Sequence, residues 1–183
     1  GTPLHQIYID VFQGSQREVG RLWQRNQLTI AQEHLCTAAT ERIMARVIAT
    51  HTMQTRLQRC IVIASVASEQ HEMGARVLAD FFEMDGWDAI FLGANTPASG
   101  VVEVVRDRQA AALAISATMT FHIPQVRDVI LRVRAHRDLS GVRVLVGGHP
   151  FNVDPDLWRR VGADGYAPDA RSAVLEARRL TGA

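Results

Sequence analysis

Residues 60–74 read CIVIASVASEQHEMG, and this stretch decides the fold. Up to residue 66 it is a run of apolar and small residues, which is typical of a strand buried on both faces of a parallel sheet. It then places Glu69, His71 and Gly74 where the next helix should begin. Ligands of open α/β sheets bind beyond the carboxyl ends of the strands, and metal-binding histidines are commonly held by a carboxylate. The stretch therefore predicts a ligand site at this edge of a sheet.

Strand-like runs and amphipathic helical segments alternate through the rest of the chain. This alternation predicts an α/β fold, in which residues 57–183 form a doubly wound, flavodoxin-like or Rossmann-like, five-stranded parallel sheet. The expected strands are 60–66, 88–93, 112–118, 142–148 and a weaker one at 165–168. The expected helices are 72–85, 97–109, 123–137, 154–161 and 169–181.

Residues 1–56 have a helical pattern, because their apolar residues recur at spacings of three and four. We expect breaks at Gly14-Ser15 and at residues 25–29. Thr29 is a plausible helix N-cap, and Gln32 three residues later completes a capping box. The segment predicts a small N-terminal helical bundle of two to four short helices.

Composition and charge exclude several classes of protein. A chain of 183 residues with 47% hydrophobic and 21% charged residues is long enough for one domain and a small accessory unit. The net charge of +1 and the lack of a Lys/Arg block predict no direct contact with nucleic acid. Cys36 and Cys60 form no disulfide framework, which favours a reducing cytoplasm, and no apolar stretch approaches the roughly 20 residues that span a membrane.

Small and polar residues lie at the carboxyl end of each of the first four predicted strands, so these strand ends should form one site. They contain Ser68–His71, Gly93–Pro97, Ser116–Thr118 and Gly147–His149. Neither the GxGxxG dinucleotide fingerprint nor a P-loop occurs, and the acidic cluster of a phosphoacceptor domain is missing. What remains is a histidine on a loop beside a glycine, with a carboxylate two residues earlier.

These motifs resemble the cobalamin-binding domains, and the resemblance covers nearly the whole chain. The family signature is Asp-x-His-x-x-Gly after the first strand, Ser-x-Leu or Ser-x-Thr after the third, and Gly-Gly after the fourth. Here they stand as Glu69-x-His71-x-x-Gly74, Ser116-Ala117-Thr118 and Gly147-Gly148. The resemblance implies that the dimethylbenzimidazole tail of cobalamin enters the sheet crevice while His71 binds cobalt as the lower axial ligand. Glu69 replaces the family's Asp and has one more methylene, a change compatible with orienting the imidazole.

The N-terminal segment resembles the cap of the CarH-type photoreceptors, which are light-responsive transcriptional regulators that bind adenosylcobalamin. The resemblance rests on Trp23 followed by Glu33-His34, and on the stretch DFFEMDGWDAIFLGANTP at residues 80–97. It implies that residues 1–56 cover the upper face of the corrin. Trp23 would pack on the adenosyl group, Glu33 would accept a hydrogen bond from it, and His34 would support the same surface.

The segment departs from that resemblance in two ways. Gln24 stands where the photoreceptors have the histidine that binds cobalt after photolysis, so another donor would be needed. His34 is the nearest candidate for that upper ligand, ahead of His5, His122 and His149. The given sequence also contains no helix-turn-helix domain like that of the regulators, so either that domain was cut away, or the module signals through a partner protein or another output domain.

The resulting hypothesis is a cobalamin-binding sensory module, a light sensor in which breakage of the cobalt–carbon bond of adenosylcobalamin changes the conformation of the cap. The main alternative is a corrinoid methyl carrier of a methyltransferase system, although a methyl group would leave no adenosyl for Glu33 to recognise. The cobalamin subunit of a mutase and a flavodoxin-like domain without cobalamin are further alternatives. Methylcobalamin or hydroxocobalamin as cofactor, and a homo-oligomer, stay open.

Overall fold

The computed structural model describes residues 1–51 and 56–182. The chain forms two compact units, residues 1–52 and residues 53–183, and each is described by itself. The boundary predicted from the sequence follows residue 56, close to this division. That the first unit covers a corrin stays a prediction.

The second unit contains a five-stranded sheet in which all neighbouring strands are parallel, in the order β2-β1-β3-β4-β5. The strands are β1 (Cys60–Ser65), β2 (Asp88–Phe91), β3 (Ala112–Ser116), β4 (Arg143–Gly147) and β5 (Gly165–Ala167). All five predicted strands are confirmed, each within a few residues of its expected ends. The strand order reverses at β1, and such a switch point opens a crevice at the carboxyl edge of the sheet.

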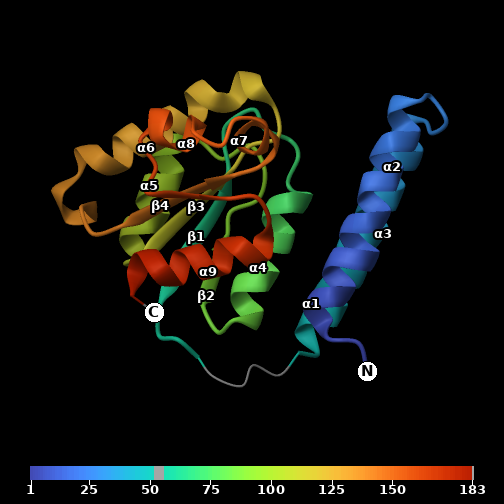
Figure 1. Cartoon of the computed structure of the whole chain (residues 1–183), viewed down its shortest axis with the longest axis horizontal. Helices are drawn as coiled ribbons and strands as arrows, with labels where there is room; N and C mark the ends of the chain where they lie inside the picture. The colour runs from blue at the N-terminus through green and yellow to red at the C-terminus, as the bar shows by residue number, and fades with distance from the viewer. Residues whose placement is uncertain (52–55, 183) are drawn as a thin grey trace. The chain divides into compact units, whose positions relative to one another are not determined.

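Helices cover both faces of the sheet, as Figure 1 shows. Helices α4 and α9 pack side by side on one face, whereas α5 and α6 pack together on the other. The helices are α4 (Met73–Met84), α5 (Ala98–Asp107), α6 (Ile123–Ala135), α7 (His149–Val153), α8 (Leu157–Val161) and α9 (Ala170–Thr181), with short 3-10 turns at Thr120–His122 and Arg137–Leu139. The predicted helices are confirmed, and α7 was not predicted because its five residues are too few to show a helical period.

The core explains why the central strands read as continuous apolar runs. Ile61, Val62 and Ile63 of β1 are fully buried, so residues pointing to either face of the sheet are covered by helices. Outside the core, Arg178 of α9 donates to both carboxylate oxygens of Asp85 at 2.8 and 2.9 Å. The indole of Trp87 donates to the same carboxylate, which ties the turn after α4 to the last helix.

The described part of the first unit, residues 1–51, is a pair of helical segments joined by a turn. The first runs from residue 4 to 24 as α1 (Leu4–Ile7), a π-helical stretch (Tyr8–Gln13) and α2 (Gly14–Gln24), and the second is α3 (Ile30–Ala49). The break predicted at Gly14-Ser15 is wrong. Gly14 has helical backbone angles, and the helix continues because Tyr8 and Phe12 are buried just before it. The break at residues 25–29 and the capping box of Thr29 and Gln32 are confirmed.

The two helical segments contact each other through few apolar and several polar side chains. Gln16 of α2 donates to Thr40 at 2.8 Å, and its side-chain oxygen lies 3.0 Å from the hydroxyl of Thr37. Much apolar surface stays exposed in this unit, including Ile30 and Leu35 at 61% and 70%. None of the described helices is long and apolar enough to cross a bilayer.

Candidate functional site

The loops at the carboxyl edge of the sheet meet around one buried carboxylate. Glu69 follows β1 and has no exposed surface. A carboxylate buried in this way needs hydrogen-bond or ionic partners. The loop after β3, residues 117–122, passes against it and supplies backbone and side-chain donors. The sheet topology therefore brings together residues that lie about 50 positions apart in the sequence.

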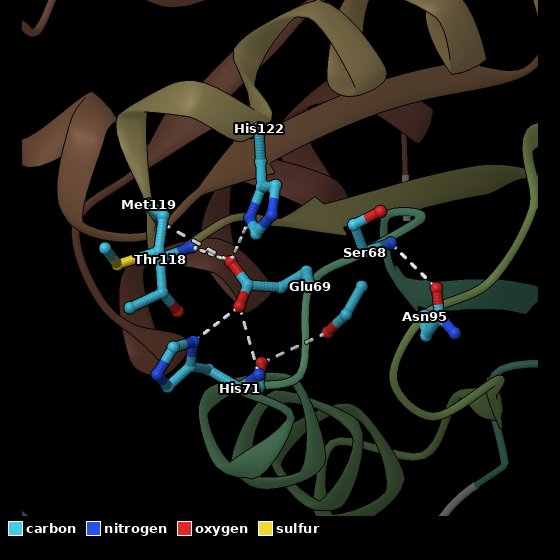
Figure 2. A network of polar contacts seen from close by, with 8 residues as sticks. Ser68, Glu69, His71, Asn95, Thr118, Met119 and His122 are labelled. Carbon is cyan, nitrogen blue, oxygen red and sulfur yellow. Dashed lines mark hydrogen bonds and ion pairs between the residues drawn. The ribbon is translucent and has the colours of Figure 1, made fainter.

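Five hydrogen-bond donors surround the two oxygens of Glu69 (Figure 2). Oε1 accepts from the backbone N–H of His71 at 3.0 Å and lies 2.5 Å from Nδ1 of the same residue. Oε2 accepts from the backbone N–H groups of Thr118 and Met119 at 2.8 and 3.3 Å. It also lies 2.9 Å from Nδ1 of His122. One carboxylate is therefore shared by two imidazoles.

The hydrogen bonds decide the charge of Glu69. Burial raises the pKa of this carboxyl, but hydrogen bonds from the backbone of Thr118 and from His71 and His122 outweigh burial and lower the pKa to about 2. The group is therefore an ionised carboxylate at neutral pH, which accepts hydrogen bonds and donates none. Each imidazole that faces it must present an Nδ1–H.

This arrangement fixes the chemistry of His71. Its side chain is 61% exposed, while the Glu69 side chain behind it is fully buried. With the proton on Nδ1, a neutral His71 ring has its free lone pair on Nε2, the form in which histidine binds a metal. The carboxylate also orients the ring, as partners of metal-binding histidines do.

The loop after β2 holds the Glu69 segment from another side. Asn95 accepts from the N–H of Ser68 through its side chain at 2.7 Å and donates its own N–H to the carbonyl of Glu69 at 2.8 Å. In return, the Glu72 carboxylate accepts from the N–H of Ala94 at 2.8 Å. Ser68 and Asn95 both have a positive φ, +69° and +52°, which is uncommon outside glycine. These contacts offset that strain and fix the position of the loop.

The predicted glycines differ in what surrounds them. A Cβ on Gly148, whose φ is +102°, would lie 2.0 Å from the carbonyl oxygen of Ala117, and one on Gly147 would lie 3.1 Å from that of Ala167. Gly148 is thus required by a close approach of the chain to itself. Gly74, in the first turn of α4, would bring its Cβ within 4 Å of no atom, so open space adjoins it near His71.

The two predicted hydroxyl residues, Ser116 and Thr118, lie at the carboxyl edge of the sheet, and the structure shows a contact with Glu69 for the backbone of Thr118. Ser116 ends β3, opposite Ser65 on one side and Gly147 on the other. Thr118 joins the network through its backbone N–H. The role of either hydroxyl toward a ligand stays a prediction.

The three predicted residues of the first unit lie at the turn end of the helix pair. Trp23 is near the end of α2 and is 46% exposed, while Glu33 and His34 are in the first turns of α3. Glu33 accepts from the hydroxyl of Thr37 at 2.8 Å, and its other oxygen lies 3.5 Å from Nε2 of His34. The His34 side chain is 70% exposed. This surface is open, and nothing in the unit fixes the His34 ring as Glu69 fixes His71.

The sequence analysis underestimated His122 and did not include Met119 in the site, whereas Asn95 lies in the predicted stretch Gly93–Pro97. His122 was considered only as a weak candidate for an upper ligand, yet it is 3% exposed and contacts Glu69. The signal that was available is its position: it follows the third strand by a few residues, at the same edge where the other predicted residues lie.

Fold and site together define a class of protein: a doubly wound domain that presents one oriented imidazole beyond the carboxyl ends of its strands. Among residues 1–51 and 56–182, no group of three or more His, Cys, Asp or Glu could hold a metal ion. A single imidazole fits a metal whose other ligands come from a macrocycle, as cobalt's do in a corrin. The single oriented imidazole of His71 is thus compatible with binding a corrinoid.

Comparisons with known proteins identify the family. A family model described as the B12 binding domain matches residues 59–175, and a second model with the same description matches residues 2–48. Because the first covers more than half of the chain, this protein belongs to the B12-binding domain family. The predicted cobalamin-binding fold is confirmed.

The relatives are corrinoid proteins. Dimethylamine corrinoid protein 1 of Methanosarcina acetivorans is 30% identical over 121 residues, which are 66% of this chain and 55% of that protein. The chain thus spans about half the length of this relative. The monomethylamine corrinoid protein of Methanosarcina barkeri has the same fold, with a TM-score of 0.79 at 18% identity over 98% of this chain and 85% of that one. The methanol:cobalamin methyltransferase complex MtaBC of the same organism contains a chain with a TM-score of 0.61 at 18% identity, covering 96% of this chain and 67% of that one.

These relatives correct the branch assigned from the sequence. They are methylamine and methanol corrinoid proteins, and the expected closeness to CarH-type photoreceptors and transcription regulation has no support among them. Trp23 with Glu33-His34, and the stretch at residues 80–97, were too little sequence to carry that assignment.

Proposed function

We propose that this protein carries a corrinoid and moves a methyl group between partner proteins of a methyltransferase system. The observation that carries the proposal is the ionised, fully buried Glu69, which holds the exposed imidazole of His71 with Nε2 free at the carboxyl edge of the sheet. A bound corrinoid would supply the cobalt atom that takes up a methyl group and releases it. The relatives named for dimethylamine and monomethylamine support this choice of chemistry.

In this proposal His71 would bind the cobalt of the corrinoid through Nε2. Glu69 keeps the proton on Nδ1 and prevents the ring from rotating, so the lone pair stays aimed out of the loop. The open space beside Gly74 leaves room for a ligand next to the first turn of α4. Ser116, Thr118 and Gly147 would line the crevice that takes the tail of the cofactor.

The helical unit would act as a cap on the bound corrinoid. Trp23, Glu33 and His34 are exposed or half-buried at one end of the helix pair, where their surface is available to a cofactor. A carrier must expose its cofactor to partners in turn, which favours a cap that contacts the cofactor weakly. The partner class is a methyltransferase, in line with the complex in which one solved relative was found.

The experiment is a comparison of two cofactors and one substitution. The protein is loaded in the dark with methylcobalamin or adenosylcobalamin, and affinities are measured from visible spectra for the wild type and Glu33→Ala. A carrier should bind methylcobalamin at least as tightly as adenosylcobalamin, and Glu33→Ala should change both affinities by the same factor. A strong preference for adenosylcobalamin that Glu33→Ala abolishes, together with a changed elution volume after illumination, would favour the light sensor instead.

The role of His71 is tested separately, by electron paramagnetic resonance of the protein loaded with cob(II)alamin. A histidine ligand splits the cobalt signal through its axial nitrogen, and labelling the protein with ¹⁵N changes that splitting from three lines to two. We expect the change in the wild type and its loss in His71→Ala. His34→Ala is the control and should keep the two-line pattern; a splitting insensitive to protein labelling would remove His71 from the cobalt.

A further inference from the structure

The outer strand β2 has an open edge for which the proposed function has no use. The N–H groups of Asp88 and Leu92 donate to carbonyls on the β1 side. Because backbone groups point alternately to the two edges of a strand, the N–H and C=O groups of Ala89 and Phe91 point away from β1. Among the described residues, no strand pairs with that outer edge of β2.

The two outer strands of the sheet differ in how their edges are protected. Proteins commonly protect an edge with a very short strand, a proline or charged residues. β5 spans three residues and is followed directly by Pro168. β2 contains no proline, and its one charged residue, Asp88, stands at its first position. An edge of this kind is a template for a strand of another chain.

Helix α4 places a positive and a negative side chain beside the open edge. It runs antiparallel to β2, because it links the end of β1 to the start of β2. The Cζ atom of Arg76 lies 4.6 Å from the centroid of the Phe91 ring, and its Nε is buried without a hydrogen-bond partner in the described part of the chain. Glu83, about two helical turns later, shares a hollow with Ala89. Within residues 1–51 and 56–182, neither Arg76 nor Glu83 forms an ion pair.

That hollow adjoins the start of β2 and has a volume of about 600 Å³. Its wall contains the carboxylates of Glu83 and Asp88 and the guanidinium of Arg56, so its charge favours a further cation. On its α4 side, the strand thus has a small residue beside a hollow, Ala89, and a large residue under a cation, Phe91.

We propose that two copies of this chain associate through their β2 edges, antiparallel and related by a two-fold axis, so that the two sheets become continuous. Ala89 of each copy then lies opposite Phe91 of the other, and the two residues exchange both backbone hydrogen bonds. Phe91 of one copy enters the hollow beside Ala89 of the other. The Arg76 guanidinium above it meets the Glu83 carboxylate of the other copy. The patch is self-complementary, as a two-fold interface requires.

The antiparallel arrangement has a consequence for the candidate site. The carboxyl end of each β2 lies beside the amino end of the other, so the two carboxyl edges face opposite ends of the joined sheet. Both His71 sites stay accessible, and each can receive a cofactor or a partner independently. The association itself requires no corrinoid.

Sedimentation velocity of the full chain without cofactor, over a range of concentrations, tests the proposal. We expect the wild type to shift from monomer to dimer as the concentration rises. Arg76→Glu places like charges opposite each other and should weaken the association at least about tenfold. Glu83→Arg should weaken it similarly. An equimolar mixture of these two variants should restore the dimer, because each carboxylate in the mixed pair faces a guanidinium.

Glu103→Arg is the control, since Glu103 is exposed on α5 and its replacement should leave the association unchanged. Ala89→Pro removes an N–H that points away from β1 and should abolish the dimer while the circular dichroism spectrum stays that of the wild type. A wild type that is monomeric at every concentration overturns the proposal. A dimer that the charge variants do not weaken, or that their mixture does not restore, overturns it as well and places the contact on another surface. The charge variants decide the question even where Ala89→Pro does not fold.

The same samples keep this proposal separate from the proposed function. If the wild type dimerises as expected but takes up no methylcobalamin, the methyl-carrier function fails and the β2 pairing stands. If it takes up methylcobalamin and stays monomeric, the pairing fails and the function stands.

Discussion

Two glutamate–histidine pairs stand in this chain, and they are built in opposite ways. In the sheet unit, Glu69 is fully buried, receives five donors and lies 2.5 Å from Nδ1 of His71. In the helical unit, the Glu33 side chain is 28% exposed and lies 3.5 Å from the ring of His34, which is itself 70% exposed. The residue types are the same, and the surroundings differ.

This difference indicates that the Glu69–His71 pair is pre-organised and that the Glu33–His34 pair is not. A buried carboxylate surrounded by fixed donors holds its histidine in one tautomer and one orientation, because any other arrangement leaves a buried charge without partners. A carboxylate that faces water loses little when its neighbour moves, because water replaces the lost hydrogen bond. The first pair suits a permanent metal ligand, and the second suits a surface that engages and releases a cofactor.

The largest effect is expected where the loops around Glu69 are packed most closely. Gly148→Ala would place a Cβ 2.0 Å from the carbonyl oxygen of Ala117, directly before the Thr118 N–H that binds Glu69. We expect a loss of about 4 kcal/mol or more in the free energy of unfolding. Gly20→Ala in α2 meets no atom within 4 Å and should instead stabilise its helix by up to about 1 kcal/mol. Urea denaturation measures both, and a mild Gly148→Ala would show that the loops yield easily.

The second prediction compares the two carboxylates directly. Glu69→Gln removes a charge from a site with five donors and turns one acceptor into a donor that faces other donors. This should cost about 3 kcal/mol of unfolding free energy. The matched change Glu33→Gln should cost less than about 1 kcal/mol. Equal costs, measured by urea denaturation, would mean that the two pairs do not differ as described.

The pH dependence of stability follows from the same carboxyl. The folded pKa of Glu69 is lowered from 4.5 to about 2, so its contribution is fully present above about pH 4.5 and is lost as the pH falls toward 2. The shift corresponds to about 3 kcal/mol at neutral pH. Unfolding free energies measured between pH 5 and pH 2 should fall more steeply for the wild type than for Glu69→Gln. Parallel curves would show that other groups cause the acid sensitivity.

The sequence predicts more of the fold than of the candidate site. The five strands were predictable because strands buried on both faces are continuous apolar runs, and helices with a clear period separate them. The uninterrupted helix through Gly14 was not, because glycine signals a break only where burial of its neighbours does not hold the helix together.

Within the site, Glu69 and His71 were predictable because they are two residues apart on one loop. His122 was not identified, because its contact with Glu69 joins two loops 53 positions apart and depends on how α6 begins. The contribution of Thr118 through its backbone was equally hidden, since a residue type shows its side chain and not the direction of its N–H.

The smallest effect is expected for the contact that supports Glu33. The hydroxyl of Thr37 lies within hydrogen-bond distance of both Glu33 and Gln16, at 2.8 and 3.0 Å, but it has one proton and donates to one of them at a time. Thr37→Val keeps the shape of the side chain and should cost about 1 kcal/mol or less, because water reaches the Glu33 carboxylate and takes over as donor. Thr50→Val, at the exposed end of α3, is the control and should cost no more. If urea denaturation instead shows Thr37→Val to be as costly as Glu69→Gln, then Glu33 is also held in place by its surroundings, and the helical unit presents a pre-organised surface rather than an adaptable one.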